Sequence, residues 1–299
     1  MTVAPPIYAI IGPTASGKSD LAMALARRVG GEILSVDSMQ VYRGMDIGTA
    51  KPTAAEQRDV RHHMIDVVEP DQPFTAARFV ELADAAIADA RSRNVPLIAV
   101  GGTPLYFKVL FEGMFDGPGA DEGVRTRLRA LPNEELHRRL SEADPSAAAR
   151  IHMNDTKRLI RALEVIELTG KPISSLQTEW ESPAAPRHEA KWIGLSWEKD
   201  ALNRRINARV KAMLEAGWVD EVRALLTRYG TLSKTASEAT GYAELIEHVN
   251  GRLSLDDAAE QIKIATRQLA RRQMKWFKRF PNVQWLPGDA SVDENLRSI

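Results

Sequence analysis

Hydrophobic residues in the first hundred positions alternate between short continuous runs and longer stretches with helical spacing. The short runs predict strands at residues 8–11, 32–36 and 95–100, and the helically spaced stretches predict helices at 18–29 and about 75–92. Parallel strands need long crossover connections, so apolar strands separated by helices are typical of a parallel sheet with helices on its faces. The chain is therefore expected to begin with a doubly wound α/β core.

The strand pattern disappears through the middle of the chain. Residues 121 to about 181 predict short capped helices, with starts at Asn133 and Asp144 and a stop at Gly170. The Pro-rich segment 182–187 is expected to be an exit linker. This stretch therefore predicts an all-helical insertion.

The last third of the chain returns to the first pattern. A strand is predicted at residues 192–197, followed by helices at about 199–217, 219–229, 238–249 and 253–279. The simplest layout is an α/β core, residues 1–114 and 191–299, interrupted by an all-helical domain at 115–190. The C-terminal helices are expected to pack back on the core.

Composition narrows the class of protein. With 44% hydrophobic and 27% charged residues, the chain is expected to be a soluble globular protein. The absence of cysteine excludes disulfides, thiolate zinc sites and cysteine nucleophiles. The longest apolar runs are far too short for a membrane span, and no signal segment opens the chain. We therefore expect a cytoplasmic protein.

Charge is balanced overall, with 40 basic and 40 acidic residues, but it is unevenly distributed. Residues 261–280 carry basic side chains and no acidic one. On a helix, one face would hold Arg267, Arg271, Lys275 and Lys278, and the opposite face would hold Ile262, Ala265, Leu269, Trp276 and Phe280. Such a basic face suits a nucleic-acid backbone, but it also serves simply to keep a helix soluble.

Residues 12–19, GPTASGKS, fit the phosphate-loop pattern G-x-x-x-x-G-K-[ST] and lie between a predicted strand and a predicted helix. The expected ligands of an oligophosphate are the residues of this loop, namely Gly12, Pro13, Thr14, Ala15, Ser16, Gly17, Lys18 and Ser19. Lys18 would supply a positive charge, and the Ser19 hydroxyl would hold Mg²⁺. The motif predicts a P-loop NTPase-like, nucleotide-kinase-like core.

The motif does not say what happens to the phosphate. Nucleotide hydrolases usually end a second apolar strand in a metal-supporting Asp, but here residues 96–100 run into Gly101-Gly102-Thr103. Asp37 instead lies after the strand that follows the loop helix, at the edge where ligands of such sheets bind. Asp37 as a general base and Asp37 as a cap of the following turn are equally compatible with this spacing.

Two other polar segments carry weaker signals. The charged loop 43–52 is either a binding loop or, as we favour, a solvated connection. His62 and His63 are adjacent and lack a carboxylate at metal-ligand spacing, so a metal pair is not expected. One of them is expected to pack or form a bridge near Asp66.

Several segments together resemble the tRNA dimethylallyltransferase family, also called isopentenyl-tRNA transferases. They are GPTASGKS at 12–19, DSMQVY at 37–42, RGMDIGTAKP at 43–52 and GGTPLYF at 101–107, with further agreement at 149–152, 158–164, 221–225, 241–242 and 266–272. The resemblance extends from about residue 7 to 285. The lack of a cysteine–histidine zinc finger after the core is typical of the shorter bacterial type.

The resemblance implies a function. Family members transfer the dimethylallyl group of dimethylallyl diphosphate to N6 of adenosine 37, beside the anticodon of tRNAs that read codons beginning with U. The products are N6-isopentenyladenosine and diphosphate, and Mg²⁺ assists. The phosphate loop would then hold a leaving diphosphate, which explains why a hydrolase-type acid is dispensable.

The resemblance also implies roles for individual residues. Asp37 is the base that deprotonates the adenine amine, Arg223 is a further cation on the diphosphate, and Thr103 lines the same channel. The residues implied to touch the tRNA anticodon stem-loop are Asp37, Ser38, Met39, Gln40, Thr103, Arg125, Lys157, Arg158, Leu159, Ile160 and Arg161. No protein partner is implied, and a monomer is expected because a channel open to both substrates needs no second subunit.

Two other functions use the same residues. A small-molecule or nucleotide kinase would share the phosphate loop and an Asp after the second strand, and it would transfer phosphate from ATP. A non-catalytic nucleic-acid-binding protein that senses a nucleotide would bind RNA without turnover. The basic helix and the middle segments favour the transferase over the kinase.

Overall fold

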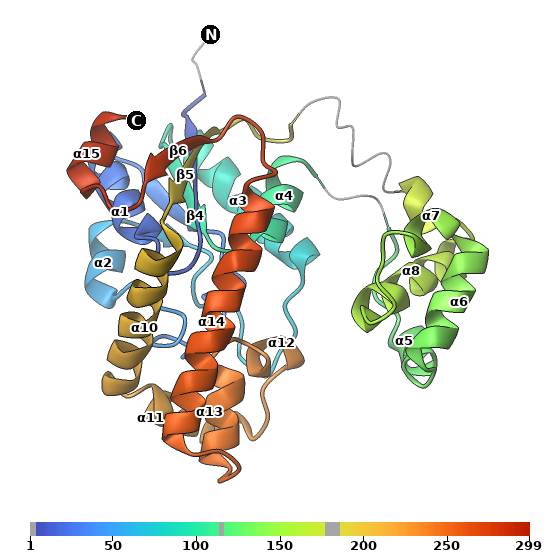
Figure 1. Ribbon diagram of the computed structural model, residues 1–299. Coiled ribbons are helices and arrows are strands. Elements are labelled where there is room, and N and C mark those ends of the chain that lie inside the picture. The colour runs from blue at the N-terminus through green and yellow to red at the C-terminus, as the bar shows by residue number, and fades with distance from the viewer. Residues whose placement is uncertain (1–3, 114–116, 177–185) are drawn as a thin grey trace. The chain divides into compact units, whose positions relative to one another are not determined.

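The computed structural model describes residues 4–113, 117–176 and 186–299 (Figure 1). Its strands are β1 (Ile7–Ile11), β2 (Glu32–Ser35), β3 (His62–His63), β4 (Leu97–Gly101), β5 (Lys191–Ser196) and β6 (Gln284–Pro287). The helices of the first half are α1 (Lys18–Val29), α2 (Ala54–Asp59), α3 (Ala76–Ser92), α4 (Pro104–Phe111), α5 (Glu122–Arg129), α6 (Asn133–Ala143), α7 (Pro145–Ala148) and α8 (Thr156–Thr169). Those that follow β5 are α10 (Lys199–Glu215), α11 (Trp218–Tyr229), α12 (Lys234–Ser237), α13 (Tyr242–Val249), α14 (Leu255–Phe277) and α15 (Val292–Arg297).

The chain divides into two compact units. Unit 1 comprises residues 1–110 and 188–299, and unit 2 comprises residues 111–187. Unit 2 has its own hydrophobic core, in which α6 and α8 pack together and α5 packs on α8. The exit linker expected at 182–187 lies largely outside the described residues.

Unit 1 is built on a six-stranded, all-parallel sheet in the order β3-β2-β4-β1-β5-β6. The predicted parallel α/β core is therefore confirmed. The two edge strands β3 and β6 and the helix α15 were not predicted. β3 has two residues, and β6 buries only Leu286, so neither shows a hydrophobic period.

Helices cover both faces of this sheet. On one face, α1 and α15 pack against alternate strand residues, such as Ile10 and Ile193. Trp192 points to the opposite face because successive strand side chains alternate. There it contacts Phe107 of α4, which in turn packs edge-on against Phe277 near the end of α14. Figure 1 shows α14 running beside α10, and Phe277 of α14 packs on Phe107 of α4, so this C-terminal helix does pack back on the core.

The carboxyl ends of β2 and β4 approach each other unusually closely. Val36 donates its backbone N–H to Val100 at 2.8 Å, and its carbonyl accepts from Thr103 at 3.4 Å. A Cβ on Gly101 would lie 1.9 Å from that carbonyl oxygen, so only glycine fits there. This contact brings the segments that follow β2 and β4 together at one edge of the sheet.

We expect Gly101→Ala to lower the free energy of unfolding of unit 1 by about 1–3 kcal/mol, because the added methyl must push the two strand ends apart. Gly119→Ala is the control, because nothing lies within 4 Å of a Cβ at Gly119. It should stay within about 0.5 kcal/mol of the wild type. Urea unfolding measures both. An unchanged midpoint for Gly101→Ala would contradict the tight approach.

Candidate active site

The phosphate loop, residues 12–19, connects β1 to α1 and has the backbone of an anion site. Ala15 and Gly17 both have positive φ, at 63° and 87°. Residues of alternating handedness turn successive N–H groups toward one side. Gly17 is the N-cap of α1, and no side chain caps this helix end. The first N–H groups of α1 and its positive dipole end are therefore available to an anion.

Two side chains from the second half of unit 1 hold the loop from outside. Arg205 of α10 donates to the carbonyl of Ala15 at 2.9 Å, and the Trp197 indole donates to the carbonyl of Ser16 at 3.0 Å. The Arg205 guanidinium also stacks over the Trp197 ring at 4.6 Å. These two hydrogen bonds hold the carbonyl oxygens of Ala15 and Ser16, which carry partial negative charge, directed away from the anion site.

Positive charge accumulates beside the loop. Burial, together with the nearby Arg209, lowers the pKa of Lys18 from 10.5 to about 8, although Asp37 opposes the shift. Burial also lowers the pKa of Arg209, against the carboxylates of Asp37 and Asp20. Two cations that disfavour each other are thus held in one half-buried site, and a bound anion would relieve that repulsion.

Asp37 follows β2 and acts as a cap. Its Oδ1 accepts backbone N–H bonds from Met39 at 2.8 Å and Gln40 at 3.4 Å. The same carboxylate lies close enough to Lys18 and Arg209 to influence their pKa values. Capping through one oxygen fixes the orientation of the carboxylate, so the two roles considered from the sequence are compatible.

Thr103 and Ser38 meet where β2 and β4 end. The Thr103 hydroxyl accepts the backbone N–H of Ser38 at 3.0 Å and donates to the Ser38 hydroxyl at 3.3 Å. The structure therefore brings together the phosphate loop, Asp37, Ser38 and Thr103, which belong to three different strand ends.

Gln40 is used within the protein. Its Oε1 accepts from the Ser35 hydroxyl at 2.8 Å, and its Nε2 donates to the carbonyls of Thr49 and Ala50 at 3.3 and 3.2 Å. The amide therefore ties the turn after β2 to the loop 43–52. Its contact with tRNA stays a prediction.

The loop 43–52 is not the solvated connection that we favoured. The side chain of Lys51 is only 3% exposed and pairs with Asp46 at 2.5 Å and Asp66 at 2.6 Å. It also donates to the carbonyl of Tyr42 at 2.7 Å. A buried lysine that is paired with carboxylates has a structural role, so the charged residues of this loop stabilise its fold.

Glu221 of α11 holds the same loop from the other side. Its Oε2 accepts the backbone N–H groups of Asp46 at 2.9 Å and Ile47 at 2.7 Å, and its Oε1 accepts the Tyr242 hydroxyl at 2.6 Å. The indole of Trp218 fills the space in which a side chain at Gly48 would lie.

Arg223, the cation expected from the family motif, is a residue of α11, and its contact with a diphosphate stays a prediction. Its side chain is 55% exposed and pairs with Asp220 of the same helix at 2.8 Å. The cations that the structure places at the phosphate loop are Arg205 and Arg209 of α10. Their i, i+4 spacing places both on one helix face, but it does not indicate what that face contacts.

In unit 2, Arg125 and Arg161 bond to a buried carboxylate. Glu164 is 0% exposed and accepts from Arg125 at 2.8 Å, from Arg161 at 2.7 Å and from the backbone of Asp121 at 2.8 Å. Burial raises the pKa of Glu164, but these hydrogen bonds bring it below its usual value. Both arginines therefore stabilise unit 2 itself.

The four remaining candidates of unit 2 lie on different sides of α8. Leu159 and Ile160 are buried in the core of the unit, so their side chains do not reach the surface. Lys157 and Arg158 are exposed, and Arg158 pairs with Asp155.

The basic side of α14 is exposed as expected, but its buried side differs from the prediction. Arg271, Lys275 and Lys278 are exposed, whereas Arg267 donates to Asn207 at 2.7 Å. The buried residues of the helix are Ala258, Ile262, Ala270, Gln273 and Phe277. Of the predicted apolar face, Ile262 is buried and Ala265, Leu269, Trp276 and Phe280 are partly buried, but the prediction missed Phe277 and a polar residue, Gln273, in the interior.

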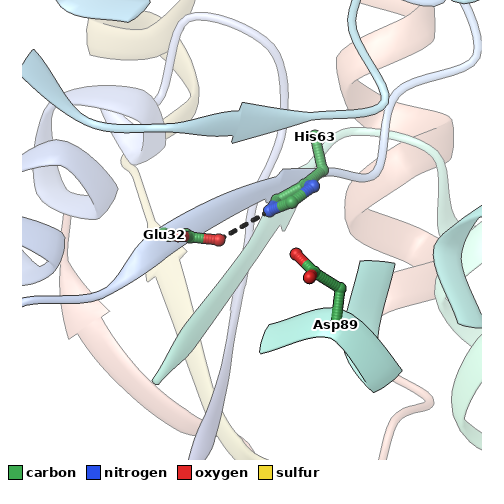
Figure 2. A group of neighbouring side chains, drawn as sticks. All are labelled: Glu32, His63 and Asp89. Carbon is green, nitrogen blue, oxygen red and sulfur yellow. Dashed lines mark hydrogen bonds and ion pairs between the residues drawn. The ribbon is translucent and has the colours of Figure 1, made fainter. Parts of the chain in front are cut away.

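A second charged cluster lies at the amino ends of the strands, away from the phosphate loop. Figure 2 shows Glu32 of β2, His63 of β3 and Asp89 of α3 pointing toward one another, with His63 2.8 Å from Glu32. Arg93 donates to both oxygens of Glu32 at 2.6 and 2.8 Å and to Asp89 at 2.7 Å. The Arg93 hydrogen bonds lower the pKa of Glu32 to about 2.

This cluster is an ion-pair network rather than a metal centre. A guanidinium already occupies both carboxylates and contributes the positive charge that a metal ion would bring. We expected a histidine to pack or form a bridge near Asp66; the bridge that forms joins His63 to Glu32, and Asp66 pairs with Lys51. Within the described residues, no helix combines the length and apolar character that a membrane span requires.

Comparison with known proteins gives one consistent answer. The model of the family described as IPP transferase matches residues 40–280. A tRNA dimethylallyltransferase of Geobacter metallireducens is 47% identical over 292 residues, which cover 96% of this chain and 94% of the relative. A relative of the same name from Geobacillus kaustophilus is 45% identical over 93% of this chain and 89% of its own length.

Solved structures agree. The full-length tRNA isopentenylpyrophosphate transferase of Bacillus halodurans has a TM-score of 0.73 at 39% identity, covering 98% of this chain and 93% of that one. A eukaryotic dimethylallyltransferase, whose structure is described as acting on tRNA, has a TM-score of 0.83 at 27% identity, covering 99% of this chain and 78% of that one.

The affinity of the loop for inorganic pyrophosphate should fall as the pH rises through about 8. Below that pH, Lys18 is already charged in the free protein. Above it, Lys18 must take up a proton when the anion binds, so the affinity falls by up to about tenfold per pH unit. Calorimetric titration between pH 6.5 and 9.5 measures this. Lys18→Arg is the control and should flatten the profile. The same slope in both proteins would contradict the assignment.

Proposed function

The chain belongs to the IPP transferase family, and from this premise we propose that it transfers the dimethylallyl group of dimethylallyl diphosphate to N6 of adenosine 37 in tRNAs that read codons beginning with U. It is an enzyme of the tRNA dimethylallyltransferase class, and its products are N6-isopentenyladenosine and diphosphate. The observation that carries the proposal is the phosphate loop with two cations, Lys18 and Arg209, close enough to Asp37 for its carboxylate to influence their pKa values.

The loop suits a departing diphosphate. As the carbon–oxygen bond of the prenyl donor breaks, negative charge grows on the diphosphate oxygens. The N–H groups at the start of α1, with Lys18 and Arg209, stabilise that charge without having to reorganise. Because Arg205 and Trp197 hold the loop carbonyls outward, the loop is preorganised for this charge.

Asp37 suits the other half of the reaction. The lone pair of an exocyclic adenine amine is delocalised into the ring, so the amine is a poor nucleophile until its proton leaves. We assign the base to Asp37: the carbon–nitrogen bond forms, the carbon–oxygen bond to diphosphate breaks, and the N6 proton passes to the Asp37 carboxylate. Thr103 and Ser38 are hydrogen-bonded to each other next to Asp37 and line the same end of the sheet.

Mg²⁺ is the metal we propose, with the Ser19 hydroxyl as its ligand from the protein. Ser19 is exposed at the first turn of α1, next to the phosphate loop, and a hydroxyl oxygen is a hard ligand of the kind Mg²⁺ prefers. When bound, the ion would add positive charge to the diphosphate site.

tRNA is the proposed macromolecular partner, and the cytoplasm is where such a substrate is met. The exposed Lys157 and Arg158 of α8 and the exposed basic residues of α14 are suited to its phosphates. The helical insertion, residues 115–190, and the segment 37–40 are proposed to contact the anticodon stem-loop. The target adenine must leave its stack to reach Asp37, at a cost of a few kcal/mol. We propose that the enzyme works as a monomer.

The direct test is to incubate the purified protein with unmodified tRNA and isotope-labelled dimethylallyl diphosphate, and to identify the labelled nucleoside by mass spectrometry. We expect the label on adenosine beside the anticodon. A parallel incubation with labelled ATP tests the kinase. Label passing from ATP to a small acceptor, with none reaching tRNA, would overturn the transferase.

Asp37→Asn should lower kcat by about 10²–10⁴-fold, because the amide cannot accept the N6 proton. Its carbonyl oxygen can still accept the N–H groups of Met39 and Gln40, so folding and tRNA affinity should be nearly unchanged. Single-turnover rates and tRNA binding measure the two effects. A variant with nearly normal turnover would remove Asp37 from the chemistry.

Arg209→Gln and Arg223→Gln separate the two candidates for the further cation. We expect Arg209→Gln to lower kcat/KM for dimethylallyl diphosphate by about 100-fold, since it removes a charge beside Lys18. Arg223→Gln should change it less than about threefold, because this side chain is exposed and pairs with Asp220. If steady-state kinetics show a larger loss of kcat/KM for Arg223→Gln than for Arg209→Gln, Arg223 is the cation of the diphosphate site.

A further inference from the structure

A buried amide of the C-terminal helix joins two parts of the active site. Gln273 of α14 is 7% exposed, one of few buried polar side chains among the described residues. Its Oε1 accepts the backbone N–H of Thr14 in the phosphate loop at 2.8 Å. Its Nε2 donates to the carbonyl of Gly102, just beyond β4, at 2.7 Å. The amide thus accepts at one end and donates at the other.

The fit around this amide is close. A Cβ on Gly102 would lie 2.6 Å from Nε2 of Gln273 and 3.8 Å from the Lys18 ammonium, so the amide and the cation lie on one side of this glycine. The next residue, Thr103, is bonded to Ser38, which follows Asp37. A single side chain therefore bridges from the loop that holds the diphosphate to the turn that adjoins the base.

The same helix carries exposed cations. Arg271, Arg272 and Lys275 flank Gln273 in sequence and face solvent, whereas Gln273 faces the interior with Ala270 and Phe277. α14 is thus attached to the phosphate loop by its buried side and presents positive charge on its other side.

We propose that Gln273 is a positioning residue, which fixes the phosphate loop relative to the Gly102–Thr103 turn and so aligns the leaving diphosphate with the base. This inference rests on the proposed function. The bridge needs a neutral side chain that both accepts and donates, because a backbone N–H faces one end and a carbonyl the other. A side chain that merely filled the volume would leave both backbone groups unpaired.

Two substitutions test the bridge. Gln273→Met keeps the size and removes both hydrogen bonds. Gln273→Glu keeps both only while its carboxyl group is protonated: the carbonyl oxygen then accepts from Thr14, and the hydroxyl donates to Gly102. Gln268→Met and Gln268→Glu are the matched controls, because Gln268 is exposed on the same helix. The single-turnover rate of prenyl transfer to tRNA is measured from pH 5.5 to 8.5. Each rate is divided by the wild-type rate at the same pH, so that the effect of groups that titrate in every variant is removed.

We expect Gln273→Met to lose about 100-fold in rate at every pH, while its affinity for inorganic pyrophosphate changes less than about fivefold. The relative rate of Gln273→Glu should also lie about 100-fold below that of the wild type, because the Lys18 ammonium beside Gly102 favours the ionised carboxylate, which cannot donate to the Gly102 carbonyl. The Gln268 variants should stay within about twofold across the range.

Gln273→Met within twofold of the wild-type rate would overturn the proposal, because filling the space would then suffice. If Gln273→Met does not fold, a rate of Gln273→Glu within twofold of the wild type overturns it, because the ionised carboxylate cannot make the bond to Gly102. A wild-type protein that binds pyrophosphate but does not prenylate tRNA would instead refute the proposed function.

Discussion

The concentration of positive charge beside the phosphate loop is the constraint on which the rest of the site depends. Lys18 and Arg209 lie close enough for each to disfavour the other's charge, and burial removes the water that would otherwise screen them. Asp37 offsets only part of that charge. A site of this kind is most stable when it holds a multiply charged anion. A diphosphate carries several negative charges on oxygens that can accept hydrogen bonds from the loop.

The topology explains why this charge meets a base. In a parallel sheet all the carboxyl ends of the strands lie at one edge, so the loop after β1, Asp37 after β2 and Thr103 after β4 are brought together although they are far apart in sequence. The contact between Gly101 and the Val36 carbonyl narrows the gap between two of these ends. Segments from the second half of the chain then bind the phosphate loop through Trp197, Arg205 and Gln273.

The parallel core and the phosphate loop could be predicted, because a buried strand, a Gly-rich turn and a helix end are each encoded by a few consecutive residues. Asp37 was found because it follows such a strand. Arg205, Arg209 and Gln273 were missed, since they reach the loop from helices about 190 to 260 residues away along the chain and no local pattern encodes that contact. In addition, Gln273 belonged to neither of the two faces that were predicted for this helix. Similarly, Leu159 and Ile160 matched a functional motif, but the amphipathic spacing of α8 places them in the core.

The central claim is that the loop at residues 12–19 grips the departing diphosphate beside Asp37. A crystal structure of the protein with an unreactive thiolodiphosphate analogue of the prenyl donor tests it most directly. We expect the two phosphates on the N–H groups at the start of α1, in contact with Lys18 and Arg209, and the allylic carbon directed toward the Asp37 carboxylate. Phosphates bound at another place on the protein, or an allylic carbon pointing away from Asp37, would contradict it.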